Sequence, residues 1–113
     1  MIRRGDFVVV AMAGDYGKPR PALIVQSDLF AALPSAALCP ISSFIRDDAD
    51  ILRLTVVPSA RNGLKQKSQI LIDKITTIPI AKISRSIGHA DDALMVSVNR
   101  ALALFLGIVG DGR

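Results

Sequence analysis

The chain has few cysteine, histidine and aromatic residues, and each shortage excludes a class of protein. Its single cysteine, Cys39, cannot form an intramolecular disulfide, and we interpret it as a small core residue of an apolar strand. With one histidine, His89, the chain lacks the ligands of a protein-only structural zinc site. The absence of Trp and the presence of one Tyr argue against a base-stacking sheet of the RNA-binding type.

Long apolar runs and nucleotide-binding motifs are also missing. The longest apolar run, residues 101–109, is about half of the roughly 18 residues that a membrane-spanning helix needs. Asp6 interrupts the positively charged start of the chain and no small-residue cleavage site follows a long apolar core, so we expect no signal peptide and a cytoplasmic protein. No GxxxxGK[ST], GxGxxG or GxSxG motif is present, and His89 is interpreted as a helix-terminus residue rather than a general base. We expect no cofactor and no metal.

What the chain does have is an apolar and moderately basic composition. Hydrophobic residues make up 50% of its 113 residues, the mean hydropathy is +0.42 and the formal net charge is +4. The length fits one domain covering residues 1–113, and the excess of apolar residues predicts a homodimer. The charge is compatible with a polyanionic partner, and equally with a basic protein that has none.

Short apolar runs between turn residues predict a mainly β fold of the α+β class. Five or six strands closed by one C-terminal helix indicate a small, partly open barrel. The expected strands cover residues 7–10, 21–26, 36–41, 52–57, 68–72 and 75–78, and the last extends the one before it after a polar break. Pro40 marks an irregularity or an edge strand.

Capping residues predict where the helices begin. Ser27 is expected to cap a short helix over 28–32, and Asp91 or Asp92 to cap the final helix over 93–106. The apolar stripe of that final helix is expected to comprise Leu94, Val98, Leu102 and Phe105, with Leu106 beside it. Residues 13–19 and 46–50 are expected to be loops, and residues 79–86 an irregular or helical connection.

Polar residues stand where several of these strands begin or end. Arg20 lies between Pro19 and Pro21, which hold the chain extended and restrict the backbone conformation on both sides of the arginine. Ser42-Ser43 and Asp73-Lys74 each follow a predicted strand. Strand ends of a small barrel can gather at one rim, where an arginine, hydroxyls, a carboxylate and a lysine suit a phosphodiester. Strand ends are also polar because loops contact water, so the pattern alone leaves a structural role open for each residue.

Four stretches of the sequence together resemble one known family. They are RRGDFVVVAM at 3–12 with GKPRPALIVQSD after it, CPISSF at 39–44, SQILIDKITTIP at 68–79, and the final helix DDALMVSVNRALALFLGIV. Their order and spacing resemble the PemK/MazF-like toxins of type II toxin–antitoxin pairs. The resemblance implies an SH3-like barrel of five to seven strands, with a C-terminal helix and one or two short helices. It also implies a homodimer and a cognate antitoxin whose C-terminal segment lies over the active site.

The activity that this resemblance implies is sequence-selective, metal-independent cleavage of single-stranded RNA, often messenger RNA. The products implied are a cyclic phosphate and a 5′-hydroxyl. By position, Arg20 matches the catalytic arginine of the family, Ser42 its catalytic threonine, and Asp73 an aspartate near the scissile phosphate. RNA-binding residues are expected to be Lys18, Pro19, Ser43, Lys65, Lys67 and Lys74, although the lysines could equally be solvated loop charges.

Departures from the family pattern limit what can be transferred. Ser42 keeps the hydroxyl and lacks the methyl group of threonine, and Lys74 stands where a glutamine is common. Leu71 stands where some members place a second catalytic arginine, and Asp15 replaces the usual glutamate of the 13–19 loop, so no RNA sequence preference is transferred.

In the expected mechanism, Arg20 stabilises the pentacoordinate phosphate and acts as a general acid, while Ser42 holds a phosphate oxygen. Asp73 either orients or deprotonates the 2′-hydroxyl, or holds Arg20 or Lys74 in place. Two alternatives remain: a toxin of the same fold that poisons DNA gyrase without catalysis, and an inactive RNA- or antitoxin-binding module.

Overall fold

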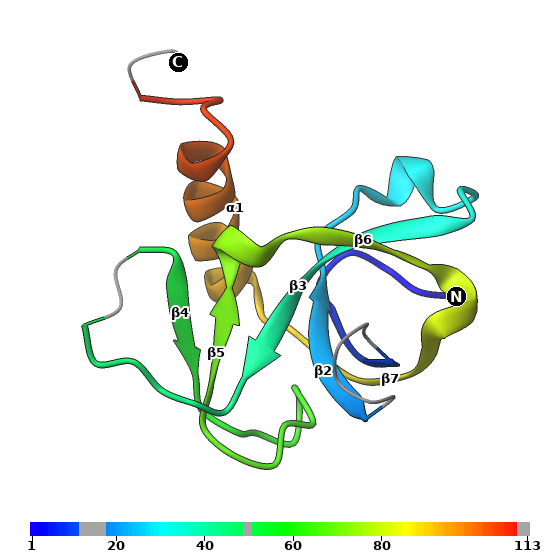
Figure 1. The fold of residues 1–113 in the computed structure, drawn as a ribbon, viewed down its shortest axis with the longest axis horizontal. Helices are drawn as coiled ribbons and strands as arrows, with labels where there is room; N and C mark the ends of the chain where they lie inside the picture. The colour runs from blue at the N-terminus through cyan, green and yellow to red at the C-terminus, as the bar shows by residue number, and fades with distance from the viewer. Residues whose placement is uncertain (12–17, 49–50, 111–113) are drawn as a thin grey trace.

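Seven strands form one open, antiparallel sheet in the computed structural model, which describes residues 1–11, 18–48 and 51–110 (Figure 1). The sheet order is β4-β5-β3-β2-β1-β7, and β6 pairs with β3 outside this path. The strands are β1 (Asp6–Ala11), β2 (Pro19–Ile24), β3 (Ser35–Ser42), β4 (Arg53–Val56), β5 (Ser68–Leu71), β6 (Thr76–Pro79) and β7 (Ile83–His89). The prediction of a mainly β, partly open barrel of five to seven strands with a C-terminal helix is confirmed.

One α-helix and three short 3₁₀ helices complete the fold. The helix is α1 (Asp92–Phe105), and the 3₁₀ helices are η1 (Asp28–Phe30), η2 (Ile72–Lys74) and η3 (Ile80–Lys82). The predicted caps are confirmed: the Ser27 side chain accepts from the N–H of Leu29, and the Asp91 side chain accepts from the N–H of Leu94 at 2.8 Å. No helix within the described residues is long and apolar enough to cross a lipid bilayer.

The long strand β3 organises the sheet. One edge pairs with β2, while the other pairs first with β6, over Ser35–Leu38, and then with β5, at Ile41 and Ser42. Pro40 lies in the gap between the β6 and β5 pairings, so its missing N–H marks the predicted irregularity. The 3₁₀ helix η2 is the polar break after which β6 continues along the same edge of β3, as predicted.

Buried side chains lie on both faces of β1, β2 and β3, because side chains alternate along each strand. Phe7, Leu23 and Cys39 belong to a cluster that α1 covers with Val98 and Leu102. A second cluster on the opposite face alternates with the first and contains Val8, Val10, Ala22, Ile24, Ala36 and Leu38. Because side chains on both faces of these three strands are buried, their sequences are nearly continuous apolar runs.

Two predictions were wrong. Residues 83–89 form the strand β7, paired with β1, where a connection was expected; its sequence ISRSIGH is mostly polar, and bulges interrupt its pairing. The buried stripe of α1 ends at Leu102, and Phe105 and Leu106 are exposed. The predicted loop at 13–19, including Asp15, falls largely outside the described residues, as do the last two residues of the 46–50 loop.

Candidate active site

The start of β2 and the end of β3 lie beside each other. The two strands are antiparallel, with Ala22 opposite Pro40 and Leu23 opposite Cys39. Arg20 and Ser42 each lie two residues beyond the last observed pair, Ala22 and Pro40, at the same end of the two strands. Both residues line one pocket of about 690 Å³, together with Pro19 and Ser43. The expectation that polar strand ends gather at one rim therefore holds for these two strands.

The pocket has an apolar floor and a cationic rim. Val9, Pro21, Ile41 and Leu71 supply apolar side chains from four strands. Its cations come from three separate segments: Arg20 on β2, Lys65 in the loop between β4 and β5, and Arg85 on β7. None of the described residues that line it is acidic or a histidine. Such a rim suits a polyanion whose charge the cations neutralise.

The turn after β3 fixes the Ser42 hydroxyl. Its Oγ accepts a hydrogen bond of 3.1 Å from the N–H of Phe44, which leaves the hydroxyl proton available for an acceptor in the pocket. The buried Gln69 side chain holds the far end of the turn: its Oε1 accepts from the N–H of Arg46, and its Nε2 donates to the Arg46 carbonyl and to Oγ1 of Thr55. Because Gln69 is also the strand partner of Ser42, the turn is tied to β5 at both ends.

The loop between β4 and β5 forms another wall of the pocket. The buried Asn62 side chain braces it, accepting from the N–H groups of Ser59 and Leu64 and donating to the carbonyl of Val57. At Gly63, φ is +70°, and an added Cβ would lie 1.9 Å from the carbonyl oxygen of Ile87. Only glycine allows the loop to approach β7 this closely, and the approach places Lys65 at the rim.

Asp73 and Lys74 do not line this pocket. They lie in η2, after the end of β5 that is remote from Gln69 and Ser42. An Asp73 carboxylate oxygen, Oδ2, is 3.3 Å from the Arg53 guanidinium, and both side chains are partly buried. Burial raises the pKa of the Cys39 thiol to about 12, and the negative charge of Asp73 makes a smaller contribution in the same direction. The structure therefore does not bring Asp73 together with Arg20 and Ser42.

The other predicted RNA-binding lysines lie beside the pocket rather than in it. Lys18 and Lys67 are exposed and do not line it, but each is next in sequence to a lining residue, Pro19 and Gln66 respectively. His89 ends β7, and its Nδ1 lies 2.9 Å from Oδ1 of Asp6, away from the pocket. Its interpretation as a residue beside the helix start agrees with this position.

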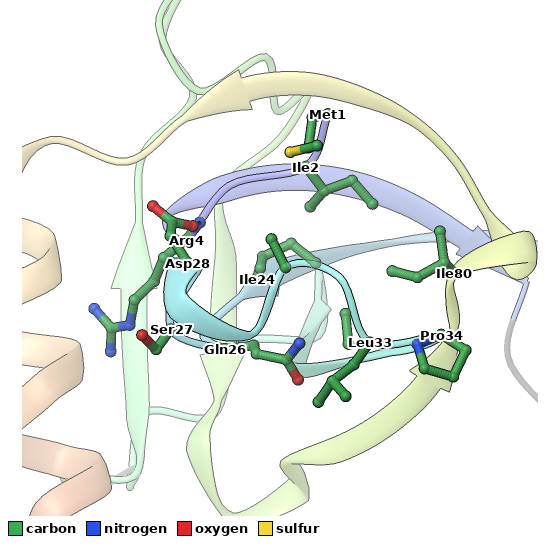
Figure 2. Close-up of a pocket in the computed structure, with 12 residues that line it drawn as sticks. Met1, Ile2, Arg4, Ile24, Gln26, Ser27, Asp28, Leu33, Pro34 and Ile80 are labelled. Atoms are coloured by element: carbon green, nitrogen blue, oxygen red, sulfur yellow. Dashed lines mark hydrogen bonds between the residues drawn. The ribbon is translucent and has the colours of Figure 1, made fainter.

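A second hollow, of about 430 Å³, lies beside the N-terminus and η1 (Figure 2). Ile2, Ile24 and Ile80 point into it, and Leu33 and Pro34 also line it, so its lining is mostly apolar. The Arg4 side chain extends away from it, with Nε donating to the carbonyl of Val25 and an Nη atom to Oδ1 of Asn99. It contains neither Arg20 nor Ser42, and its chemistry does not suit a phosphodiester.

Three residues of the pocket region were not identified from the sequence. Arg85 was missed because β7 was not predicted as a strand. Phe44 and Gln69 lie in the stretches CPISSF and SQILIDKITTIP, in which the sequence pointed to Ser42 and Asp73 as the catalytic residues. The signals in the sequence were one aromatic residue after the hydroxyl pair and one amide residue in an apolar strand.

Comparisons with known proteins agree over nearly the whole chain. A family model described as the PemK-like, MazF-like toxin of type II toxin–antitoxin systems matches residues 3–106. A probable endoribonuclease MazF of Mycolicibacterium smegmatis is 41% identical over 110 residues, which cover 96% of this chain and 100% of that protein. Endoribonuclease EndoA of Bacillus subtilis is 27% identical, over 96% of this chain and 97% of that protein.

A solved structure shares the fold. It is an endoribonuclease in complex with its cognate antitoxin from a mycobacterial species, with a TM-score of 0.80 at 21% identity, over 97% of this chain and 99% of that chain. The segment that the family model matches includes every residue that lines the pocket with Arg20 and Ser42.

Proposed function

Since the chain belongs to the PemK-like, MazF-like family of type II toxin–antitoxin toxins, we propose that it is an endoribonuclease that cleaves single-stranded RNA, such as messenger RNA. The observation that carries this proposal is that Arg20 and Ser42 line one pocket with an apolar floor and a cationic rim. The relatives named as endoribonucleases support the same activity. We expect the protein to act in the cytoplasm and to select the RNA sequences that it cuts.

The proposed reaction is a transesterification within the RNA. The 2′-oxygen bonds to the adjacent phosphorus and the bond from phosphorus to the 5′-oxygen breaks, which yields a cyclic phosphate and a 5′-hydroxyl. One proton leaves the 2′-hydroxyl and one reaches the 5′-oxygen, so the step balances without a further reactant. We propose that it also proceeds without a metal ion. Arg20 donates to the phosphate oxygens and stabilises the pentacoordinate phosphate, and the Ser42 hydroxyl donates to one of them.

Arg85 fits the role of a second phosphate-binding cation. It lines the same pocket as Leu71, which stands where some family members have a second arginine. An arginine reaching in from β7 could supply that charge from another strand. We propose a structural role for Asp73, because its carboxylate pairs with Arg53 rather than with Arg20 or Lys74, the partners that the sequence suggested.

We further propose that the toxin forms a homodimer and is neutralised by a cognate antitoxin covering the pocket. Exposed large apolar side chains support an interface between subunits, since surface of this kind is usually covered. They include Leu29, Phe30, Leu33, Leu104, Leu106, Ile108 and Val109. The related endoribonuclease solved in complex with its cognate antitoxin supports the second partner.

Cleavage of a long single-stranded RNA in the presence of EDTA tests the proposal. We expect discrete fragments with cyclic-phosphate ends from the wild type, and a rate lower by about 10²–10³-fold or more for Arg20→Ala, because a donor to the developing charge is lost. Lys82→Ala is the matched control: it removes an exposed cation that does not line the pocket, and it should cut like the wild type.

The outcome separates the alternatives. If Arg20→Ala cuts at nearly the wild-type rate, the assignment of Arg20 is wrong. If the wild type does not cut but inhibits DNA gyrase, the protein is a gyrase poison. RNA binding without cutting would make it a binding module.

A further inference from the structure

Phe44 is the only aromatic among the described residues that line the pocket with Arg20 and Ser42. It comes two residues after Ser42, and its side chain is 75% exposed, so the ring contributes little to either core cluster. A single exposed phenylalanine is unremarkable by itself. This one stands at the rim of a cationic pocket, apart from the exposed apolar residues of η1 and the C-terminal end of α1.

The backbone under this exposed ring is fixed on both sides. The N–H of Phe44 donates to Oγ of Ser42 at 3.1 Å, and Gln69 holds both the N–H and the carbonyl of Arg46, two residues further on. Because Gln69 is buried in β5, the turn that carries the ring is anchored to the sheet. An exposed ring on an anchored turn loses little conformational freedom when a flat ligand covers it.

We propose that Phe44 is a stacking platform for an unpaired RNA base next to the scissile phosphate. The Ser42 Oγ that accepts from the Phe44 N–H is also the group assigned to the phosphate, so a bound phosphate and the ring are separated by one short turn. Unpaired bases stack on exposed aromatic rings in single-stranded RNA recognition, and any of the four bases can do so. This inference rests on the proposed cleavage at Arg20 and Ser42 and adds a nucleotide-binding subsite to it.

Steady-state cleavage of an oligoribonucleotide that spans one mapped cut site tests the platform. We expect Phe44→Leu, which keeps apolar bulk and removes the ring, to raise KM by about 5- to 150-fold with kcat little changed. Phe44→Trp should restore KM. Every variant keeps the backbone N–H that binds Ser42, so a loss of kcat is not expected. Phe30→Leu is the matched control, because Phe30 is 56% exposed and lies in η1 outside the pocket. Since Phe30 is also among the exposed residues of the proposed dimer interface, light scattering must give Phe30→Leu the molar mass of the wild type.

The chain contains no tryptophan, so Phe44→Trp also creates a single fluorescent reporter. An RNA of the same sequence with 2′-O-methyl groups cannot form the cyclic phosphate and serves as an uncleaved ligand. We expect it to quench the fluorescence of Phe44→Trp through stacking and to leave that of Phe30→Trp unchanged. Light scattering should give Phe44→Leu the molar mass of the wild type.

The results distinguish this inference from the function on which it rests. If the wild type cuts RNA and Phe44→Leu has an unchanged KM, only the platform is wrong. Unquenched Phe44→Trp, or an altered molar mass of Phe44→Leu, would also overturn the platform. If the 2′-O-methyl RNA quenches Phe44→Trp while the wild type never cuts RNA, the platform stands as a binding site and the proposed cleavage fails.

Discussion

At the scale of single residues, Cys39 shows how burial controls chemistry beside the site. Its side chain is fully buried in β3, and this burial raises the thiol pKa from 9.0 to about 12. The neutral thiol is therefore favoured in the folded state, and its contribution to stability is complete below pH 9. That contribution is lost as the pH rises toward 12, because the unfolded chain releases the proton first.

We predict that raising the pH from 7 to 10 lowers the free energy of unfolding of the wild type by about 1.4 kcal/mol more than that of Cys39→Val. Both proteins share every other titrating group, so the difference isolates the thiol. Urea unfolding at fixed protein concentration measures it. Parallel pH profiles for the two proteins would show that the thiol pKa is not raised in the folded state.

The residues of the site could be predicted from the sequence in part. Arg20 and Ser42 stand out because prolines or a hydroxyl pair mark the ends of two strongly apolar strands, and these strands are neighbours in the sheet. Asp73 likewise follows an apolar strand. However, β5 runs antiparallel to β3, so the C-terminal end of β5, which leads to Asp73, lies away from Ser42. Local sequence identifies a strand end, while the direction of pairing decides which strand ends meet.

At the scale of elements, the loop between β4 and β5 depends on its contact with β7. We predict that Gly63→Ala destabilises the fold by about 1–3 kcal/mol more than Gly110→Ala. Both glycines have positive φ, but an added Cβ meets the Ile87 carbonyl only at position 63, and has nothing within 4 Å at position 110. Gly110→Ala therefore measures the backbone strain alone, and thermal or urea unfolding of both variants gives the difference.

The same change should weaken RNA cleavage, because Lys65 and Gln66 follow Gly63 directly in the wall of the pocket. Equal destabilisation by the two alanines would mean that the loop and β7 do not approach as closely as described. Without β7 there is no partner for this glycine, so its close approach to Ile87 cannot be predicted from the local sequence. The strand itself was missed because its apolar residues are few and its pairing is bulged.

At the scale of the whole molecule, composition predicted a basic protein but not where its charge lies. The formal net charge is only +4, yet three cations from β2, β7 and the β4–β5 loop line one pocket without an acidic residue among its described neighbours. Figure 1 shows the end of β3 and the β4–β5 loop together at one edge, opposite the C-terminal end of α1. The fold class could be predicted from the apolar periodicity of the sequence. The grouping of these cations could be recognised only once the order of the strands in the sheet was known.

Charge gathered in this way predicts how RNA binding responds to salt. Each phosphate that a cation neutralises on single-stranded RNA contributes about −0.7 to the slope of log K against log salt. Arg85→Ala should therefore weaken binding of the 2′-O-methyl RNA and make the slope shallower by about 0.7. Lys82→Ala removes the same charge from η3, outside the pocket, and should leave the slope unchanged. Equal effects of the two variants in a salt titration would mean that RNA binding depends only on the net charge of the protein, and that Arg85 does not bind a phosphate in the pocket.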